Sequence, residues 1–291
     1  MKRLATWALR ALIGLAAVVV VAAVAVFADS EMILNRHYPF TPAALALPQA
    51  GVAASDGARI ARLYGCGGCH GVDLRGRVIA DLPLLARIGT PNLTLVAATN
   101  SDARLAQIIR SGVQPDGRPL FLMPSAAPSR LTDPEIGALI AYIRSKPRGG
   151  SSGQGVQLGP IARLGLVFGK FKTEPQQVAA AKAKPLPEFG PDTASGRSLA
   201  RVCAECHGPD LSGDIGPDLR IAAAYDLPSF ARLLRTGIGR DGRPVRPTGL
   251  PEEKTIGLMA AESPPRFGGL SDTELAALHA YLTTRVSHLA N

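Results

Sequence analysis

The 291-residue sequence has few cysteines and few aromatic residues, and each shortage narrows its interpretation. Only four cysteines are present, and all four belong to two copies of one motif, Cys-x-x-Cys-His, so none is left for a structural disulfide. Aromatic residues make up 5% of the chain and do not cluster with basic ones, which is unlike a nucleic-acid-binding surface. With 46% hydrophobic residues and a formal net charge of +9, the composition is nevertheless that of a folded, basic protein.

The first 28 residues lack any acidic side chain and contain an uncharged apolar run. Lys2, Arg3 and Arg10 precede this run, which extends from Ala11 to Phe27. Its length lies at the border between a signal peptide and a membrane-spanning helix. We favour an uncleaved membrane anchor, and a removed signal peptide is the alternative. Basic residues ahead of a span place the N-terminus in the cytoplasm, so the rest of the chain is expected to face the periplasm.

The two cysteine motifs lie in matching surroundings, which indicates an internal repeat. The stretch CGGCHGVDLRG from Cys66 corresponds to CAECHGPDLSG from Cys203. Each copy ends in a helical pattern, LTDPEIGALIAYIRS in the first and LSDTELAALHAYLTT in the second, and both patterns begin with the spacing of a capping box. A duplicated, mainly helical module explains these matches.

The repeat divides the chain into five segments. Between the two copies, PRGGSSGQG has linker composition, and an apolar basic stretch, LGPIARLGLVFGKFK, follows it. We expect this stretch to pack between the two copies, and contact with the membrane surface is the alternative. The predicted segments are the anchor or signal peptide (1–28), a lead-in (29–54), the first domain (55–148), the linker (149–193) and the second domain (194–291).

Each Cys-x-x-Cys-His motif carries the groups that attach a haem. On a helical turn, residues three apart share a face, so both thiols can form thioethers with the two vinyl groups of one porphyrin. The histidine then directs its imidazole toward the iron. This pattern is typical of covalent c-type haem attachment. The predicted attachment residues are Cys66, Cys69 and His70 for one haem and Cys203, Cys206 and His207 for the other.

Two other chemistries use the same residue types and have less support. A thioredoxin-like dithiol needs an α/β context with strands, whereas both motifs lie in Ala-rich helical sequence. A structural zinc site usually needs four nitrogen or sulfur ligands, and each repeat offers three without a second pair nearby. Haem attachment is therefore favoured.

Haem iron in electron-transfer cytochromes often takes methionine as its sixth ligand, because the soft thioether raises the reduction potential. Of the four methionines, only Met123 and Met259 follow the first motif, one in each repeat and at nearly equal distances after the histidine. We predict that both are axial ligands to iron. His37, His279 and His288 are weaker candidates, and His279 is expected to be a packing residue.

At these residues the sequence resembles class I c-type cytochromes, twice over. The resemblance covers residues 55–147 and 194–289 and implies a mainly α fold, with two tandem class I cytochrome c domains after an N-terminal transmembrane helix. The whole arrangement is similar to a membrane-anchored dihaem cytochrome c of proteobacterial type. It implies two covalently bound haem c groups, each with its iron.

The resemblance also implies roles for residues outside the motifs. In that family, a proline soon after the motif offers its carbonyl to the second ring nitrogen of the axial histidine, and Pro91 and Pro217 match that position. The interval from histidine to proline is 21 residues in the first repeat and 10 in the second. A glycine of the first helix also packs against an aromatic residue of the last helix. The matching pairs are Gly57 with Tyr142 and Gly196 with Tyr281.

Together these features predict an electron carrier rather than an enzyme. Each haem would cycle between Fe(II) and Fe(III) without making bonds to a substrate. The expected partners are redox proteins, such as a respiratory complex, a dehydrogenase or an oxidase, with no nucleic acid and no small-molecule substrate. The anchor would hold both domains on the periplasmic side of the inner membrane. Two alternatives stay open: a subunit held permanently in a dehydrogenase or oxidase complex, and a dihaem peroxidase.

Overall fold

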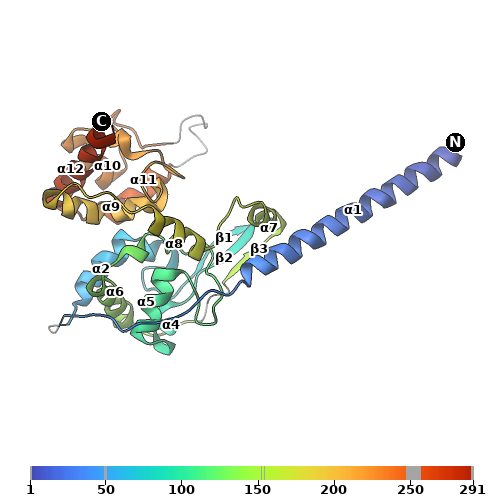
Figure 1. Cartoon of the computed structure of the whole chain (residues 1–291), viewed down its shortest axis with the longest axis horizontal. Coiled ribbons are helices and arrows are strands. Elements are labelled where there is room, and N and C mark those ends of the chain that lie inside the picture. Colours follow the sequence, from blue (N-terminus) through green and yellow to red (C-terminus); the bar gives the residue numbers. More distant parts are fainter. Residues whose placement is uncertain (1, 49–50, 152, 154, 247–256, 290–291) are drawn as a thin grey trace.

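A computed structural model describes residues 2–48, 51–151, 153, 155–246 and 257–289 of the chain. The chain is 58% helical. Its two helical units lie side by side, and one long N-terminal helix extends away from them (Figure 1).

The N-terminal helix α1 (Lys2–Leu34) is a candidate membrane span. Its stretch Ala5–Leu34 contains an 18-residue window of mean hydropathy 2.9, and none of that window is buried against the rest of the chain. An apolar helical stretch of this length, unburied within its own chain, matches the requirement for crossing a bilayer. The helix continues past the apolar run through Asp29 and Glu31 to Leu34, so its last two turns carry both acidic and apolar side chains.

The first unit forms around the contact between its first and last helices. A side chain cannot fit at Gly57, because a Cβ atom there would lie 1.9 Å from the Ala138 carbonyl oxygen and 2.7 Å from Tyr142 Cβ. The predicted pairing of Gly57 with Tyr142 is therefore confirmed. The helices of this unit are α2 (Ala54–Leu63), α3 (Cys66–His70), α4 (Leu93–Thr99), α5 (Asp102–Ser111) and α6 (Asp133–Ser145), with a 3-10 turn η1 (Pro128–Arg130).

The second unit repeats this packing. A Cβ atom at Gly196 would lie 2.1 Å from the Ala277 carbonyl oxygen and 2.7 Å from Tyr281 Cβ, which confirms the second predicted pair. Both predicted capping boxes are also present, at Thr132 in the first unit and at Ser271 in the second. The elements of this unit are η2 (Pro191–Thr193), α9 (Ala194–His207), η3 (Leu219–Ala224), α10 (Leu227–Thr236), α11 (Leu258–Phe267) and α12 (Asp272–Leu289).

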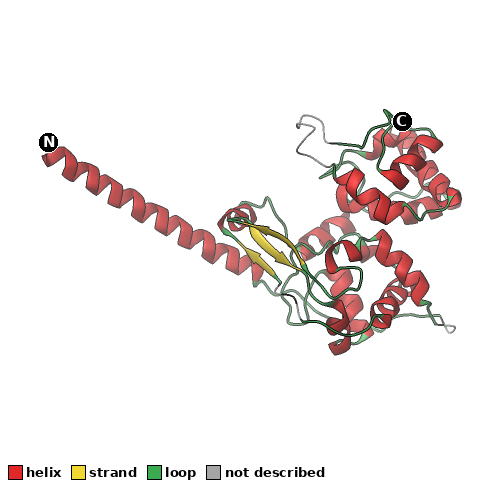
Figure 2. Cartoon of the chain, turned by 180° about the vertical axis from the view of Figure 1, so that it is seen from behind, coloured by secondary structure: helices red, strands yellow, loops and turns green. Residues whose placement is uncertain are grey.

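The extra residues of the first repeat form a small antiparallel sheet, which the sequence analysis did not anticipate. Strands β1 (Val78–Leu82) and β2 (Ala86–Gly89) make a hairpin between the motif and Pro91. Strand β3 (Val156–Leu158) of the linker pairs with β2, so the strand order is β1-β2-β3. The sheet lies beside the C-terminal end of α1 (Figure 2). This insertion accounts for the longer interval between His70 and Pro91.

The linker contains two helices with different neighbours. Helix α7 (Pro160–Val167) packs against the end of α1, so the expectation that this apolar basic stretch lies between the two units is wrong for α7. Helix α8 (Glu174–Ala183) does lie between the units (Figure 1). Its first residue, Glu174, is almost fully buried and accepts a hydrogen bond of 2.9 Å from the Ser125 backbone nitrogen.

Replacing Gly57 or Gly196 by alanine is expected to destabilise the corresponding unit by at least about 2–3 kcal/mol, because the added methyl group meets backbone atoms that cannot rotate away. Ser55→Ala and Ser195→Ala, at exposed positions of the same helical segments, are matched controls. Denaturant unfolding of the full-length protein measures the effect. A glycine variant as stable as its serine control would contradict this account of the packing.

Burial raises the pKa of Glu174 to about 7 from the ordinary value of 4.5. The folded chain therefore keeps a proton that the unfolded chain releases, so stability falls as pH rises through the interval from about 4.5 to 7. At pH 8 this loss is on the order of 3 kcal/mol in the free energy of unfolding, and at pH 4 there is none. We expect the substitution Glu174→Gln to remove the loss. Unfolding measured across pH tests this, with the exposed Glu188→Gln as control. A pH profile unchanged by Glu174→Gln would contradict the assignment.

Candidate functional site

Each motif histidine is held by the carbonyl of the proline that the sequence singled out. His70 Nδ1 lies 3.0 Å from the Pro91 oxygen, and His207 Nδ1 lies 2.7 Å from the Pro217 oxygen. A carbonyl oxygen only accepts hydrogen bonds, so Nδ1 carries the proton and donates. Burial lowers the pKa of both histidines, although the bond to proline acts in the opposite direction. The neutral tautomer that results leaves the Nε2 lone pair free for a metal ion.

The turn after each motif has the same geometry in both units. Gly76 donates its backbone N–H to the His70 carbonyl at 2.8 Å, and Gly213 donates to the His207 carbonyl, also at 2.8 Å. Within each turn a buried leucine adopts a left-handed backbone, with φ of 59° at Leu74 and 64° at Leu211. Such a conformation is unusual for leucine and persists where the surrounding structure enforces it. The repeated turn thus fixes the backbone from the motif to the proline.

The two units hold the second motif cysteine with different chemical groups. In the second unit, the backbone N–H of Gly216 donates to the Cys206 carbonyl at 2.7 Å. In the first unit, the Thr90 hydroxyl lies 2.9 Å from the Cys69 carbonyl oxygen. A Cβ atom at Gly216 would lie 2.7 Å from His207 Cε1, so the glycine leaves space for the imidazole ring.

None of the four motif cysteines forms a disulfide, and burial in their surroundings disfavours the thiolate. Burial raises the pKa of Cys66 to about 11 and that of Cys203 to about 12, and it also raises the pKa of Cys69 and Cys206. Across the described part of the chain, no group of three or more His, Cys, Asp or Glu side chains is placed to hold a metal ion by itself.

The two predicted methionine ligands each border the core that their own motif contacts. Met123 and Cys66 pack against the core of the first unit, and Met259 and Cys203 pack against the core of the second. Met123 follows Leu122, whose φ of 72° turns the chain sharply before it. Met259 is in the first turn of α11, and part of the long loop that precedes it, residues 247–256, lies outside the described residues.

The three remaining histidines have other surroundings. His279 Nε2 lies 2.8 Å from the Tyr225 carbonyl oxygen, and its ring contacts Phe230 at 5.0 Å between centroids, so it is a packing residue as expected. His288 lies against the Phe189 ring and near the Thr284 carbonyl. His37 is exposed.

One buried arginine of the second unit links its motif to the chain just before the motif of the first unit. Arg266 of α11, with 8% of its side chain exposed, donates to the Leu63 carbonyl of the first unit at 2.8 Å. It also pairs with Glu205, which lies between the two cysteines of the second motif, at 2.5 Å. Burial disfavours the charge of Arg266, but the Glu205 carboxylate outweighs it and raises the pKa of the guanidinium. Arg266 therefore stays charged beside both motifs.

Further polar contacts join the units around this pair. Arg130 of the first unit donates to the Pro209 carbonyl at 3.0 Å, and Arg201 of the second donates to the Arg130 carbonyl at 2.6 Å. Arg59 and Glu274 form an ion pair across the same interface. Tyr64, two residues before the first motif, packs against the cores of both units. The sequence did not reveal these residues, because a local pattern does not show which side chains meet after folding.

A family model described as Cytochrome c matches residues 54–147 and again residues 193–285, which together make up more than half of the chain. The chain belongs to the cytochrome c family. No curated protein matches it. Membership of this family implies covalently bound haem c, and two matched segments indicate two haems.

The residues of each cytochrome c unit fit a haem c by their chemistry. Two uncharged thiols can each form a thioether, and a neutral imidazole with its Nδ1 proton fixed by proline presents Nε2 to iron. Bound haem supplies one-electron chemistry at its iron. The protein residues orient the imidazole, and the apolar cores that contact Cys66 and Cys203 limit the access of water.

We expect Met259→Ala to lower the potential of the second haem and to let it bind carbon monoxide, because the iron loses its thioether ligand. Met123→Ala should do the same to the first haem alone. Potentiometric titration and absorption spectra under carbon monoxide distinguish the two haems, and Leu258→Ala, at an exposed neighbouring position, is the control. Unchanged potentials without gas binding would show that these methionines are not ligands.

Proposed function

We propose that this cytochrome c is a dihaem electron carrier that passes single electrons between membrane or periplasmic redox partners. In this proposal His70 with Met123 and His207 with Met259 ligate the two irons, and the cysteines of each motif hold the haems. The N-terminal helix would keep both units on the periplasmic side of the inner membrane. The family match supports the electron-transfer role, and the interface between the units supports direct exchange between the two sites.

The observation that carries this proposal is the contact of Arg266 with the second motif and with the chain just before the first motif. The guanidinium binds the chain three residues before Cys66 and a carboxylate between Cys203 and Cys206. The two attachment segments therefore lie at the interface rather than on opposite faces of the molecule. Electron exchange falls steeply with distance, so this placement favours a relay through the chain over two independent carriers.

Buried polar contacts also make the relative position of the units well defined. Arg266 and Arg201 are both largely buried where they cross the interface, and each satisfies a backbone carbonyl of the other unit. Removing one partner of such a pair leaves a buried charge without compensation, which is costly. The units are thus held as one body, as a relay requires.

Two measurements on the full-length protein test the proposed function. A carrier should show two one-electron steps in a redox titration and should neither turn over hydrogen peroxide nor show a high-spin iron. Peroxide turnover with half of the haem high-spin would instead identify a dihaem peroxidase. Purification from membranes in mild detergent distinguishes a free carrier from a permanent subunit, because the subunit would leave with stoichiometric companions.

Replacing Arg266 by Gln is expected to lower both haem potentials, because a positive charge near a haem favours the ferrous state. The double variant Arg266→Gln/Glu205→Gln removes the pair together and should return the potentials toward those of the unaltered protein. Arg220→Gln, in an exposed ion pair of the same unit, is the control. A shift confined to one haem in the redox titration would contradict the position of Arg266 between the two sites.

A further inference from the structure

The linker helix α7 packs against α1 at the end of the apolar run. Arg163 of α7 lies over the Phe27 ring, with its guanidinium carbon 4.3 Å from the centroid. The same guanidinium donates to Ser30 Oγ at 2.7 Å and pairs with Glu31 at 2.7 Å. Phe27 is the last large apolar residue before the first acidic residue, Asp29. Helix α7 therefore lies at the level where α1 would emerge from the hydrocarbon of a bilayer into its headgroups.

Helix α7 presents an apolar face away from the protein. Ile161, Leu164 and Phe168 lie three and four residues apart, so they share one side of the helix. They are 54%, 44% and 69% exposed, respectively. The opposite side, with Ala162 and Leu166, is buried. An amphipathic helix at this level matches one that lies in the membrane interface with its apolar face toward the acyl chains.

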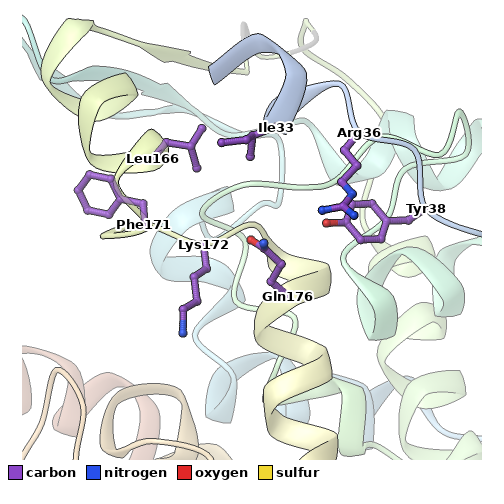
Figure 3. A pocket seen from close by; sticks show the side chains of 8 residues that line it. Ile33, Arg36, Tyr38, Leu166, Phe171, Lys172 and Gln176 are labelled. Atoms are coloured by element: carbon purple, nitrogen blue, oxygen red, sulfur yellow. The ribbon is translucent and has the colours of Figure 1, made fainter. Parts of the chain in front are cut away.

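A crevice of about 290 Å³ opens beside this helix, between α1, α7 and the start of α8. Its walls combine apolar and cationic side chains: Ile33, Tyr38, Leu166 and Phe171, with Arg36 and Lys172 (Figure 3). A second hollow shares Ile33 and Arg36 with the first and is also lined by Asp29, Met32 and Val167. The two hollows therefore adjoin each other at the C-terminal end of α1.

The charge of the crevice favours an anion. Within the described residues, neither Arg36 nor Lys172 forms an ion pair, and Arg36 stacks near the Tyr38 ring with its guanidinium carbon 5.9 Å from the centroid. Of the acidic groups at this end of α1, Glu31 is paired with Arg163, which leaves Asp29 in the second hollow. Two cations beside apolar walls match a ligand with a phosphate head and acyl chains.

We propose that this crevice binds one anionic phospholipid of the surrounding bilayer, with the phosphate on Arg36 and Lys172 and the acyl chains along Ile33, Leu166 and Phe171. Such a lipid would join α1, α7 and α8 at the membrane surface. Because α8 also lies between the two units, the bound lipid would fix the orientation of both relative to the membrane. The proposal is independent of electron transfer and concerns only the anchored end of the chain.

Native mass spectrometry of the full-length, haem-loaded protein in detergent tests this inference. Titration with phosphatidylglycerol should show one lipid bound in preference to phosphatidylcholine. Arg36→Gln/Lys172→Gln should weaken phosphatidylglycerol binding about 10- to 30-fold, since each basic residue near anionic lipid contributes a several-fold gain in affinity. Arg104→Gln/Lys182→Gln, which removes the same residue types at exposed positions outside the crevice, should leave binding unchanged.

Two further measurements test whether free phosphate can replace the lipid and whether weaker binding could come from misfolding. Inorganic phosphate in excess should not displace the lipid, because the acyl chains contribute to binding. The charge-conserving variant Arg36→Lys/Lys172→Arg should retain binding, and its haem spectrum reports on folding. The proposal is overturned if the protein retains phosphatidylglycerol and phosphatidylcholine equally. It is also overturned if Arg36→Gln/Lys172→Gln binds phosphatidylglycerol as tightly as the unaltered protein, or if inorganic phosphate displaces the lipid.

Discussion

The close approach of the first and last helices organises each unit of this cytochrome c. Gly57 and Gly196 allow backbone to meet backbone, and a single methyl group at either position would collide with a carbonyl of the last helix. Because the haem motif follows directly on that first helix, its place relative to the core is set by this contact. In the second unit, α9 runs unbroken from Gly196 through His207, whereas in the first unit Gly65 turns left-handed between α2 and α3. The same helix packing thus supports a motif that continues the first helix and a motif that follows a break in it.

The relation between the two units depends on charge, not on apolar contact alone. Arg266 is a cation buried at the interface, and its partners are the Leu63 carbonyl and the Glu205 carboxylate. Its charge also acts on the thiols of Cys66 and Cys203. In the proposed relay, one side chain would therefore both fix the interface and tune the two sites.

Sequence patterns predicted those features that depend on local spacing or on the repeat. The motifs and the capping boxes at Thr132 and Ser271 each appear twice in the sequence, so each copy supports the interpretation of the other. The two glycine–tyrosine contacts came instead from the resemblance to class I c-type cytochromes. The sheet is absent from the described part of the second repeat, so no second copy of β1 and β2 could reveal them, and β3 follows directly on a segment with linker composition. The Arg266 pair depends on how the units dock, and no local pattern encodes that.

The linker connects the membrane end of the chain to the interface between the haem units. Its helix α7 is held to α1 by Arg163, and its helix α8 begins at the buried Glu174, which anchors it to the first unit. Farther along, Arg130 donates to the carbonyls of Ala181 at 2.9 Å and of Pro209 in the second unit. Each of these contacts is specific and at least partly buried, so α1, the linker and both units form one connected structure. A change at the anchored end can therefore alter how the two haem sites face their partners without altering either site.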